Sequence, residues 1–399
     1  MLTGHDMIYF GDNWDGVWRN RQQLLSILAQ YNRVLFVEKE RHIRPTLAQF
    51  RQGELGRADL QRPCTRHIGD NLFVFRHPVW APVSGRFPLK QLTQKVRWLY
   101  LQRAIRELGI SQPIVWFYHP KWIEMVPRFS QARLRLYHVI DEYSSYQGKS
   151  EARRSREAEW EKEMLAQVNA VIVVSEKLYE AKHAYNSHTF IVPNGVNYQA
   201  YSEALAVPDL PSELETIPPP RLGYLGLVGD KLDLSILKNL AQENPAWSLV
   251  FLGPTNVNAQ AQTWQALQAM PNVYYLGSVG VSQVPHYVKG FQVGLMPYLQ
   301  DYHAETISPL KLYDYLAAGL PIASMDIPAA REFQSHIHLA ETPAHFAQAV
   351  RDALANTAPE RYQARRNLAS QHTWQARTER ISDLIQTLLD EGSGKNRQK

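Results

Sequence analysis

Short apolar runs alternate with longer amphipathic stretches along almost the whole chain. The runs are rich in β-branched and aromatic residues, which favours buried strands, and the stretches between them have the spacing of helices. This alternation is typical of parallel sheets whose strands are joined by helical crossovers. The expected strands are Met7–Gly11, Arg33–Glu38, Leu72–His77, Ile114–His119, Arg135–Asp141, Ala170–Ser175, Thr189–Pro193, Leu222–Leu227, Ser248–Leu252, Val273–Leu276, Val293–Pro297, Pro321–Ser324 and Ile337–Leu339.

A proline-rich break divides this pattern into two halves. Residues 204–220 contain five prolines and little periodicity, so we expect a linker there. The halves, residues 1–203 and 221–370, are each expected to be a doubly wound α/β domain of Rossmann-like type. A mixed-charge helix over Glu151–Gln167 should lie mostly in solvent. We expect a final helix over residues 371–390 and a disordered tail over 391–399.

Composition supports two folded domains. The chain has 399 residues, 45% of them hydrophobic and 20% charged, which excludes intrinsic disorder and exceeds the usual size of one core. The single cysteine, Cys64, excludes a disulfide within the chain and a multi-cysteine metal site. No signal segment and no apolar run of about 18 residues is present, so we expect a soluble cytoplasmic protein.

The charge is distributed unevenly. Residues 1–200 carry a formal net charge of +9, and residues 201–399 carry −4. A basic first half favours an anionic partner, which could be a phosphate group, a nucleic acid or a membrane surface.

The segment "ISPLKLYDYLAAGLPIAS", residues 307–324, has the features of an anion-binding helix start. Ser308 suits the N-cap position and Pro309 the first helical position. Leu310 and Lys311 would then present backbone amides and an ammonium at the positive end of the helix, where a phosphate binds well.

Asp314 lies about one turn after Lys311 on the same predicted helical face. Its carboxylate could accept hydrogen bonds from the vicinal hydroxyls of a ribose. A diphosphate at the helix start and a ribose one turn along describe a nucleotide diphosphate. The alternative is an ordinary capped helix with a solvated pair of charges.

A glycine-containing turn supports the nucleotide hypothesis. In "RLGYLGLVGDKLD", residues 221–233, Gly226 would allow the backbone to approach a ligand, and Lys231 adds positive charge. The glycines are evenly spaced by three, unlike the G-x-G-x-x-G fingerprint of dinucleotide-binding folds. The position where that fold needs an acidic residue is Gly253, so nicotinamide chemistry is disfavoured.

These motifs resemble the nucleotide-sugar domain of GT-B glycosyltransferases, particularly the family 4-like enzymes of bacterial envelope and exopolysaccharide synthesis. The matching segments are "GYLG", "DKLDLSIL", "SLVFLGP", "NVYYLGSV", "VGLMPY" and "SPLKLYDYLAAGLPIAS". The first half resembles the family more loosely, through "VNAVIVVSEKL" and "IVPNGVNYQAY". The resemblance implies two facing Rossmann-like domains, a central cleft and a C-terminal helix that crosses back to the first domain.

The resemblance also implies roles for single residues. It places Asp314 where the family has a ribose-binding glutamate, and it places the donor in the second domain and the acceptor in the first. Many members carry a second glutamate eight residues earlier, where this chain has Thr306 beside Glu305.

Two strand ends of the first half supply candidate catalytic groups. Asp141 ends a predicted strand and resembles the general base of some inverting relatives; the alternative is a turn or capping aspartate. His119 also ends a strand, and its alternative is a structural histidine. The loop after the first strand supplies Asp15, Gly16 and Arg19 as candidate acceptor contacts, although such arginines often decorate solvated helices.

A basic, aromatic stretch over Gly85–Leu108 could rest on anionic lipid and bring a lipid-linked acceptor near; the alternative is a core-packed crossover helix. No nucleic-acid recognition motif accompanies this charge. No D-x-D or H-E-x-x-H motif is present, so we expect no metal and no cofactor other than the donor substrate.

These features predict a glycosyltransferase that moves a sugar from a nucleotide-diphosphate donor to a glycan or lipid-linked acceptor. The enzymatic alternative is a nucleotide-sugar epimerase on the same fold. The alternative from another class is a non-catalytic nucleotide-sugar sensor or scaffold subunit.

Overall fold

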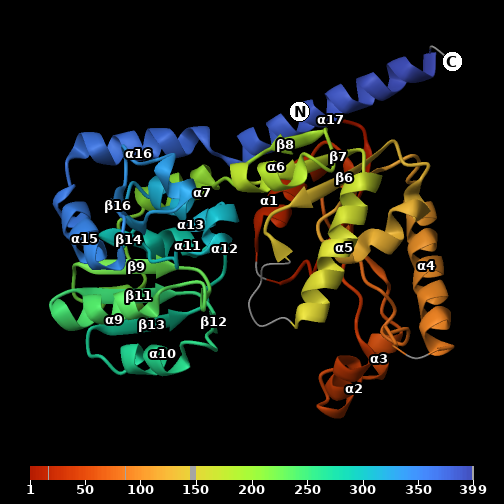
Figure 1. Ribbon diagram of the computed structural model, residues 1–399. Coiled ribbons are helices and arrows are strands. Elements are labelled where there is room, and N and C mark those ends of the chain that lie inside the picture. Colours follow the sequence, from red (N-terminus) through yellow and green to blue (C-terminus); the bar gives the residue numbers. More distant parts are fainter. Residues whose placement is uncertain (17, 86, 144–149, 398–399) are drawn as a thin grey trace. The chain divides into compact units, whose positions relative to one another are not determined.

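The computed structural model describes residues 1–16, 18–85, 87–143 and 150–397, which form two compact units (Figure 1). The first unit comprises Met1–Val173, Leu178–Val192 and Thr378–Lys399, and the second comprises Val174–Lys177 and Pro193–Arg377. Within the described residues, no helix is both long and apolar enough to cross a membrane.

The first unit is built on an eight-stranded sheet in the order β3-β4-β2-β1-β5-β6-β7-β8. All seven strands expected in this half are present and parallel. The eighth, β3, is antiparallel to β4 and was missed because its residues are polar and largely exposed. The strands are β1 (Asp6–Phe10), β2 (Arg33–Val37), β3 (Thr65–Gly69), β4 (Leu72–Phe75), β5 (Ile114–Phe117), β6 (Leu134–Val139), β7 (Ala170–Val173) and β8 (Thr189–Ile191).

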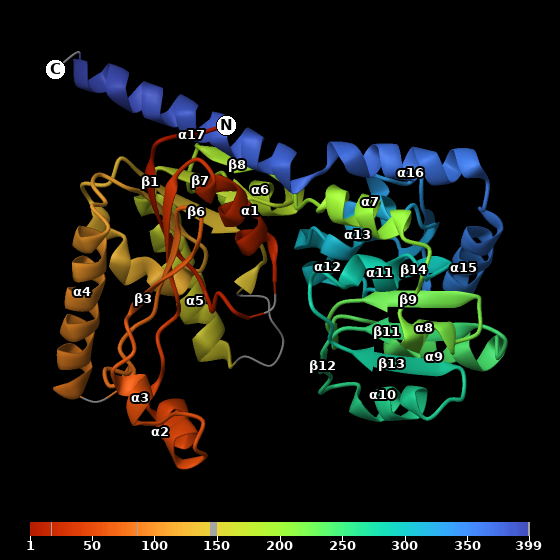
Figure 2. The same ribbon diagram turned by 180° about the vertical axis from the view of Figure 1, so that it is seen from behind.

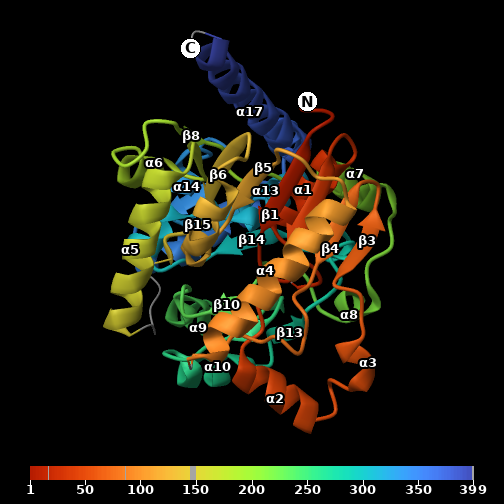
Figure 3. The same ribbon diagram turned by 90° about the vertical axis from the view of Figure 1, so that its right-hand side faces the viewer.

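Helices cover this sheet, and the longest of those between its strands is α4, which Figure 3 shows from the side of the first unit. The expected helix over Glu151–Gln167 is α5, but one face of it is buried. There Lys182 donates at 2.7 Å to both Glu161 and Glu142, so two carboxylates share one buried ammonium. The helical segments are α1 (Asn20–Ala29), α2 (Ile43–Arg51), α3 (Arg57–Leu60), α4 (Leu89–Glu107), η1 (Pro120–Met125), η2 (Pro127–Phe129), α5 (Glu151–Gln167) and α6 (Glu176–Lys182).

The second unit has a six-stranded parallel sheet in the order β13-β11-β9-β14-β15-β16, part of which Figure 2 shows as neighbouring arrows. All six expected strands are present, because their aliphatic residues fill one continuous core. A short parallel pair, β10 (Val228–Gly229) with β12 (Thr255–Asn256), lies outside this sheet. The main strands are β9 (Arg221–Leu225), β11 (Ser248–Leu252), β13 (Val273–Gly277), β14 (Val293–Met296), β15 (Ile322–Met325) and β16 (His338–Ala340).

Residues 204–220, expected to be a linker, are part of the second unit. They contain the end of α7 and all of α8, and Leu214 and Ile217 belong to the buried core. The proline-rich segment is therefore packed as part of the second unit and is not a linker between the units. The helical segments of this part are α7 (Tyr198–Ala206), α8 (Ser212–Glu215), α9 (Leu234–Glu243), α10 (Ala261–Gln268), α11 (Val284–Val288), α12 (Tyr302–Thr306), α13 (Leu310–Ala317), α14 (Pro328–Arg331), η4 (Pro343–His345), α15 (Phe346–Ala355) and α16 (Pro359–Gln371).

The last helix, α17 (Trp374–Arg397), begins in the second unit and belongs to the first from Thr378 onward. Its residue Ser382 contacts the first residue of the chain, Met1. The expected helix over 371–390 is therefore present and returns to the first unit. The tail over 391–399 was expected to be disordered, but the helix continues to Arg397, since extending an existing helix costs far less than starting one.

Candidate functional site

The ammonium of Lys311 is held at the end of the second sheet by two tyrosines. Its Nζ donates to the hydroxyls of Tyr224 and Tyr298, each at 2.9 Å, and lies 4.3 and 4.8 Å from the centres of their rings. Tyr224 belongs to β9, and Tyr298 closely follows the neighbouring strand β14. Lys311 stands in the first turn of α13 directly after Leu310, so a helix start and two strand ends meet at one cation.

Two glycines bring backbone close to this cation. Gly226 and Gly253 follow β9 and β11 and have φ values of +116° and +141°. A Cβ on Gly226 would lie 3.5 Å from Cε of Lys311, and a Cβ on Gly253 only 2.3 Å from the oxygen of Gly226. The two strand ends therefore pack backbone against backbone beside Lys311. The approach of a ligand to the Gly226 backbone stays a prediction.

Burial makes the charge of this site sensitive to its surroundings. Desolvation and the nearby Lys231 lower the pKa of Lys311 to about 7, although Asp314 opposes the shift. Desolvation also raises the pKa of Asp314 to about 7, against the opposing influence of the Tyr201 hydroxyl and of Lys311. An anion bound beside Lys311 would replace lost solvation and favour its protonated form.

Ser308 is not the N-cap of the helix, although the sequence had suggested that it is. The N-cap of α13 is Pro309, without a side-chain capping bond, and the helix begins at Leu310. The Ser308 hydroxyl instead accepts from the backbone N–H of Asn194 at 3.2 Å, and the Ser308 carbonyl accepts from the Asn194 amide at 2.7 Å. Because Asn194 belongs to the motif "IVPNGVNYQAY", that segment anchors the approach to α13 and leaves Ser308 buried.

The remaining second-unit candidates lie near the same helix. Lys231 is exposed, and its carbonyl accepts from the N–H of Leu299, which ties its loop to the segment after β14. Asp314 is half-buried, and its ribose contact stays a prediction. Thr306 is fully buried and donates to the His303 carbonyl at 2.9 Å, whereas its neighbour Glu305 is exposed.

In the first unit, His119 and Asp141 follow adjacent parallel strands, β5 and β6, and so belong to one edge of the sheet. Nδ1 of His119 accepts from the Lys121 N–H at 3.1 Å, and its ring lies 4.3 Å from that of Tyr143. Oδ1 of Asp141 accepts from the Glu142 N–H at 3.0 Å, as a turn aspartate does. The buried Glu142–Lys182 pair anchors this turn.

Asp12, which follows β1 at the same edge, is engaged in several interactions. It accepts from the Tyr118 hydroxyl at 2.8 Å and lies 3.5 Å from Nζ of Lys121 and 3.7 Å from Nη2 of Arg21. Burial alone would raise the pKa of Asp12, but Lys121, the Tyr118 hydrogen bond and Arg21 together lower it. Asp12 is therefore ionised at neutral pH and holds the side chains of Tyr118, Lys121 and Arg21 together at this edge of the sheet.

The three predicted acceptor contacts of the first loop, Asp15, Gly16 and Arg19, each have different partners. Asp15 pairs with Arg66 at 2.6 Å and also with Arg76, which join it to the β3–β4 hairpin. Arg19 is the N-cap of α1, and its N–H donates to Gln22 at 3.0 Å. The backbone of Gly16 donates to the Asn13 carbonyl in a turn.

Sequence reasoning missed the tyrosines that define the second-unit site. Tyr224 and Tyr298 have the hydrophobic character of strand residues, and only the converging strand ends show that their hydroxyls meet one amine. Tyr201 of α7 was also missed, because only the tertiary structure brings its hydroxyl close to Asp314. Among the residues that the structure describes, no group of three or more histidine, cysteine or acidic side chains could hold a metal ion.

Residues 230–356, all within the second unit, match the family model described as glycosyl transferases group 1. TuaH of Bacillus subtilis (strain 168), named for a glycosyltransferase role in teichuronic acid biosynthesis, is 32% identical over 188 residues. The match covers 46% of this chain and 47% of that relative, so the chain matches about half of the length of its relative.

Solved structures show the same fold over nearly the whole chain. Sucrose-phosphate synthase from Thermosynechococcus elongatus superposes with a TM-score of 0.69 at 15% identity, covering 97% of this chain and 100% of that one. HepE of Anabaena, in complex with UDP and glucose, gives 0.64 at 13% identity, covering 96% and 100%. WaaG, a glycosyltransferase involved in lipopolysaccharide biosynthesis, gives 0.60 at 13% identity, covering 95% and 99%.

Residues 230–356 are thus similar to the group 1 glycosyltransferases, and the chain as a whole has the GT-B fold of these solved structures. The segment matched by the group 1 family model contains Lys231, Tyr298, Lys311 and Asp314, whereas Tyr224 and Gly226 come just before it. The Lys311 site is thus assembled from the matched segment and from β9, the strand that precedes it.

The close approach of the Gly253 and Gly226 backbones predicts the effect of adding a side chain at Gly253. Gly253→Ala should lose about 3 kcal/mol of unfolding free energy, because its Cβ would meet a backbone oxygen as well as an unfavourable φ. Gly277→Ala is the control, since Gly277 has φ +71° but nothing within 4 Å of the added Cβ. It should lose only about 1 kcal/mol. Urea denaturation would measure both, and equal losses would contradict the proposed packing.

Proposed function

We propose that this protein transfers a sugar from a nucleotide-diphosphate donor, with UDP as the nucleotide, to a glycan or lipid-linked acceptor of the cell envelope. The buried Lys311 ammonium at the start of α13 carries the proposal. The relation to a protein of teichuronic acid biosynthesis and the UDP complex of a structural neighbour support it. The proposed site of action is the cytoplasm.

Lys311 suits a leaving diphosphate for a physical reason. Its two present partners are neutral hydroxyls, so the ammonium is hydrogen-bonded but carries no compensating charge from them. A diphosphate would supply that charge, helped by the amides at the helix start and by the exposed Lys231. These cations would stabilise the leaving group without a metal ion.

Lys311→Met should weaken UDP-glucose binding by about 10- to 100-fold, because it removes a charge-assisted contact. Calorimetry from pH 6 to 8 should show wild-type affinity falling as pH rises, since the pKa of Lys311 is about 7 and anion binding needs its protonated form. Ionisation of Asp314 over the same range adds repulsion in the same direction.

Lys238→Met is the matched control, because Lys238 lies on α9 away from the tyrosines. It should keep both the affinity and its pH dependence. If Lys311→Met bound UDP-glucose as tightly as the wild type, the proposed diphosphate site at Lys311 would be wrong.

Asp141 is the proposed general base for the acceptor hydroxyl. It follows β6 at the edge that also carries His119, which we propose contacts the substrates there. Asp12 is less suited, because its lowered pKa and its two cationic neighbours make it a weak base. Contacts of Asp15, Gly16 and Arg19 with the acceptor remain part of the proposal.

Asp141→Asn should bind UDP-glucose normally and lose transfer by about 100-fold or more, since the amide cannot take the proton. Exposed Asp209→Asn is the control and should keep turnover. Product analysis by NMR separates the alternatives: an epimerase would change the donor sugar without an acceptor, and a sensor would bind the donor with no turnover. Full transfer by Asp141→Asn would exclude it as the base.

A peripheral contact of α4 with an anionic membrane is also proposed. Leu92 and Leu99 are 60% and 59% exposed and recur on one helical face with the exposed Lys95 and Arg106. Arg97 faces inward, pairing with Glu40 at 3.4 Å, so only part of the basic stretch is available. An apolar ridge flanked by cations suits an anionic lipid surface.

Leu99→Glu should lower partitioning onto phosphatidylglycerol vesicles about tenfold, because it removes apolar burial and adds repulsion. Leu47→Glu on α2, where Leu47 is 50% exposed, is the control and should partition like the wild type. A vesicle sedimentation assay would measure both, and an equal loss in the two variants would contradict the assignment of the surface to α4.

A further inference from the structure

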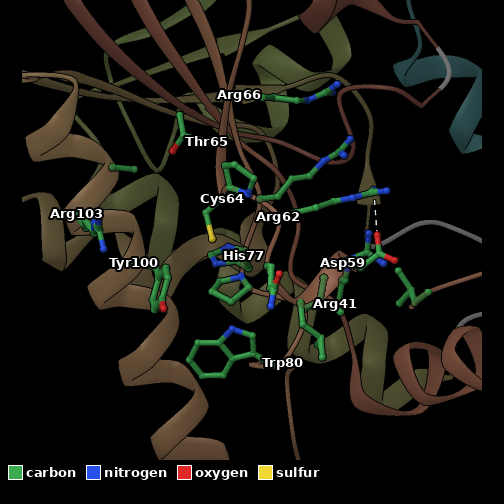
Figure 4. A pocket seen from close by; sticks show the side chains of 18 of the residues that line it. Arg41, Asp59, Arg62, Cys64, Thr65, Arg66, His77, Trp80, Tyr100 and Arg103 are labelled. Atoms are coloured by element: carbon green, nitrogen blue, oxygen red, sulfur yellow. Dashed lines mark ion pairs between the residues drawn. The ribbon is translucent and has the colours of Figure 1, made fainter. Parts of the chain in front are cut away.

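A cavity of about 650 Å³ lies within the first unit, apart from the strand ends that carry His119 and Asp141. It is formed by α3, by β3 and the residues before it, by the segment after β4, and by the second half of α4 (Figure 4). This volume is in the range that holds a small ligand such as one or two sugar rings.

Arginines dominate the polar lining. Five arginines face two carboxylates, those of Asp59 and Glu107. Arg62 pairs with Asp59 at 3.0 Å, as the dashed line in Figure 4 marks, whereas Nη1 of Arg41 donates to the neutral amide oxygen of Gln49 at 3.0 Å. The lining arginines are Arg41, Arg62, Arg66, Arg76 and Arg103. Guanidinium groups bind carboxylate and phosphate through two parallel hydrogen bonds, so the cavity favours an anion.

Another part of the lining is aromatic. Trp80 is 48% exposed, and its ring meets that of Tyr100 edge to face at 5.7 Å. Figure 4 shows both rings near His77 and Cys64, with Arg62 and Arg66 on another side. Burial lowers the pKa of His77 to about 3, so this histidine adds no positive charge at neutral pH. Exposed aromatic rings offer a flat apolar face, which suits the C–H face of a sugar ring better than a bare ion.

We propose that this cavity binds an anionic saccharide of the acceptor, with its carboxylate or phosphate on the arginines and its ring against Trp80. The inference rests on the proposed function and specifies the class of acceptor. A nucleic acid is disfavoured because the cavity is enclosed by one small group of elements and does not form an extended basic stripe.

A chain of ion pairs connects the cavity to the first loop. Arg66 and Arg76 line the cavity and both pair with Asp15. Arg76 also pairs with Glu38 at 2.7 Å, and Glu38 accepts from the N–H of Trp14 at 2.9 Å. An anion in the cavity would compete with Asp15 for these arginines, so occupancy of the cavity would act on the loop predicted to contact the acceptor.

Calorimetry with methyl glucuronide and methyl glucoside tests the proposal, because the two ligands differ only at the carboxylate. We expect the glucuronide to bind at least about tenfold more tightly, and Arg41→Gln or Arg62→Gln to remove that preference. Trp80→Ala should weaken binding of both ligands. Arg51→Gln, an exposed arginine on α2 outside the cavity, is the matched control and should keep the preference.

Further probes distinguish the source of the anion. Glucose 6-phosphate should bind in place of the glucuronide if the acceptor carries phosphate, which also supports the proposal. Equal binding of glucuronide and glucoside, or acetate binding as tightly as glucuronide, would overturn it. So would loss of phosphatidylglycerol vesicle binding by Arg41→Gln without any saccharide binding, since the anion would then be a lipid headgroup.

UDP-glucose affinity is measured in the same variants and should not change. If UDP-glucose binds through Lys311 but no anionic saccharide binds, this inference fails and the donor function stands. If the glucuronide binds but UDP-glucose does not, the proposed transferase function fails instead.

Discussion

In a parallel sheet every strand ends at the same edge, and both candidate sites of this protein depend on that constraint. In the first unit it brings Asp12, His119 and Asp141 together from three strands that are far apart in the sequence. In the second unit it brings Tyr224, Gly226, Gly253 and Tyr298 to the start of α13. Loops at this edge lie outside the close-packed core, so polar side chains can gather there.

The second unit uses this edge to bury one positive charge. Transfer of an ammonium out of water is costly unless its donors are satisfied, and two tyrosine hydroxyls satisfy two of them. Burial and the nearby Lys231 still lower the pKa of Lys311 to about 7, because the neutral hydroxyls supply no charge that would offset them. The result is a buried cation that favours an anion, although this half of the chain has a net negative charge.

The first unit handles its positive charge differently. Several of its arginines have carboxylate partners, as Arg76 does with Asp15 and Glu38. Such pairs hold the guanidinium groups in place at the wall of a cavity, so an incoming anion meets oriented donors and loses less entropy. The exposed leucines of α4 are a separate feature, on a helix whose opposite face packs inward through Thr93, Arg97 and Leu101.

The alternation of apolar runs was sufficient to predict the thirteen main parallel strands, because each is a short run rich in apolar residues and most of these runs are buried. It missed β3, whose exposed residues have no such pattern, and it took the prolines of 204–220 for a linker although Leu214 and Ile217 enter the core. The helix that carries Lys311 and the turn that carries Gly226 were predictable, because capping and turn preferences are local. Tyr224, Tyr298 and Gly253 were not, because their roles come from contacts between segments far apart along the chain. The sequence alone therefore determined the main parallel strands and the helix that carries Lys311. Only the tertiary structure decided which neutral groups surround its ammonium, because burial and hydrogen-bond partners depend on how the strand ends converge.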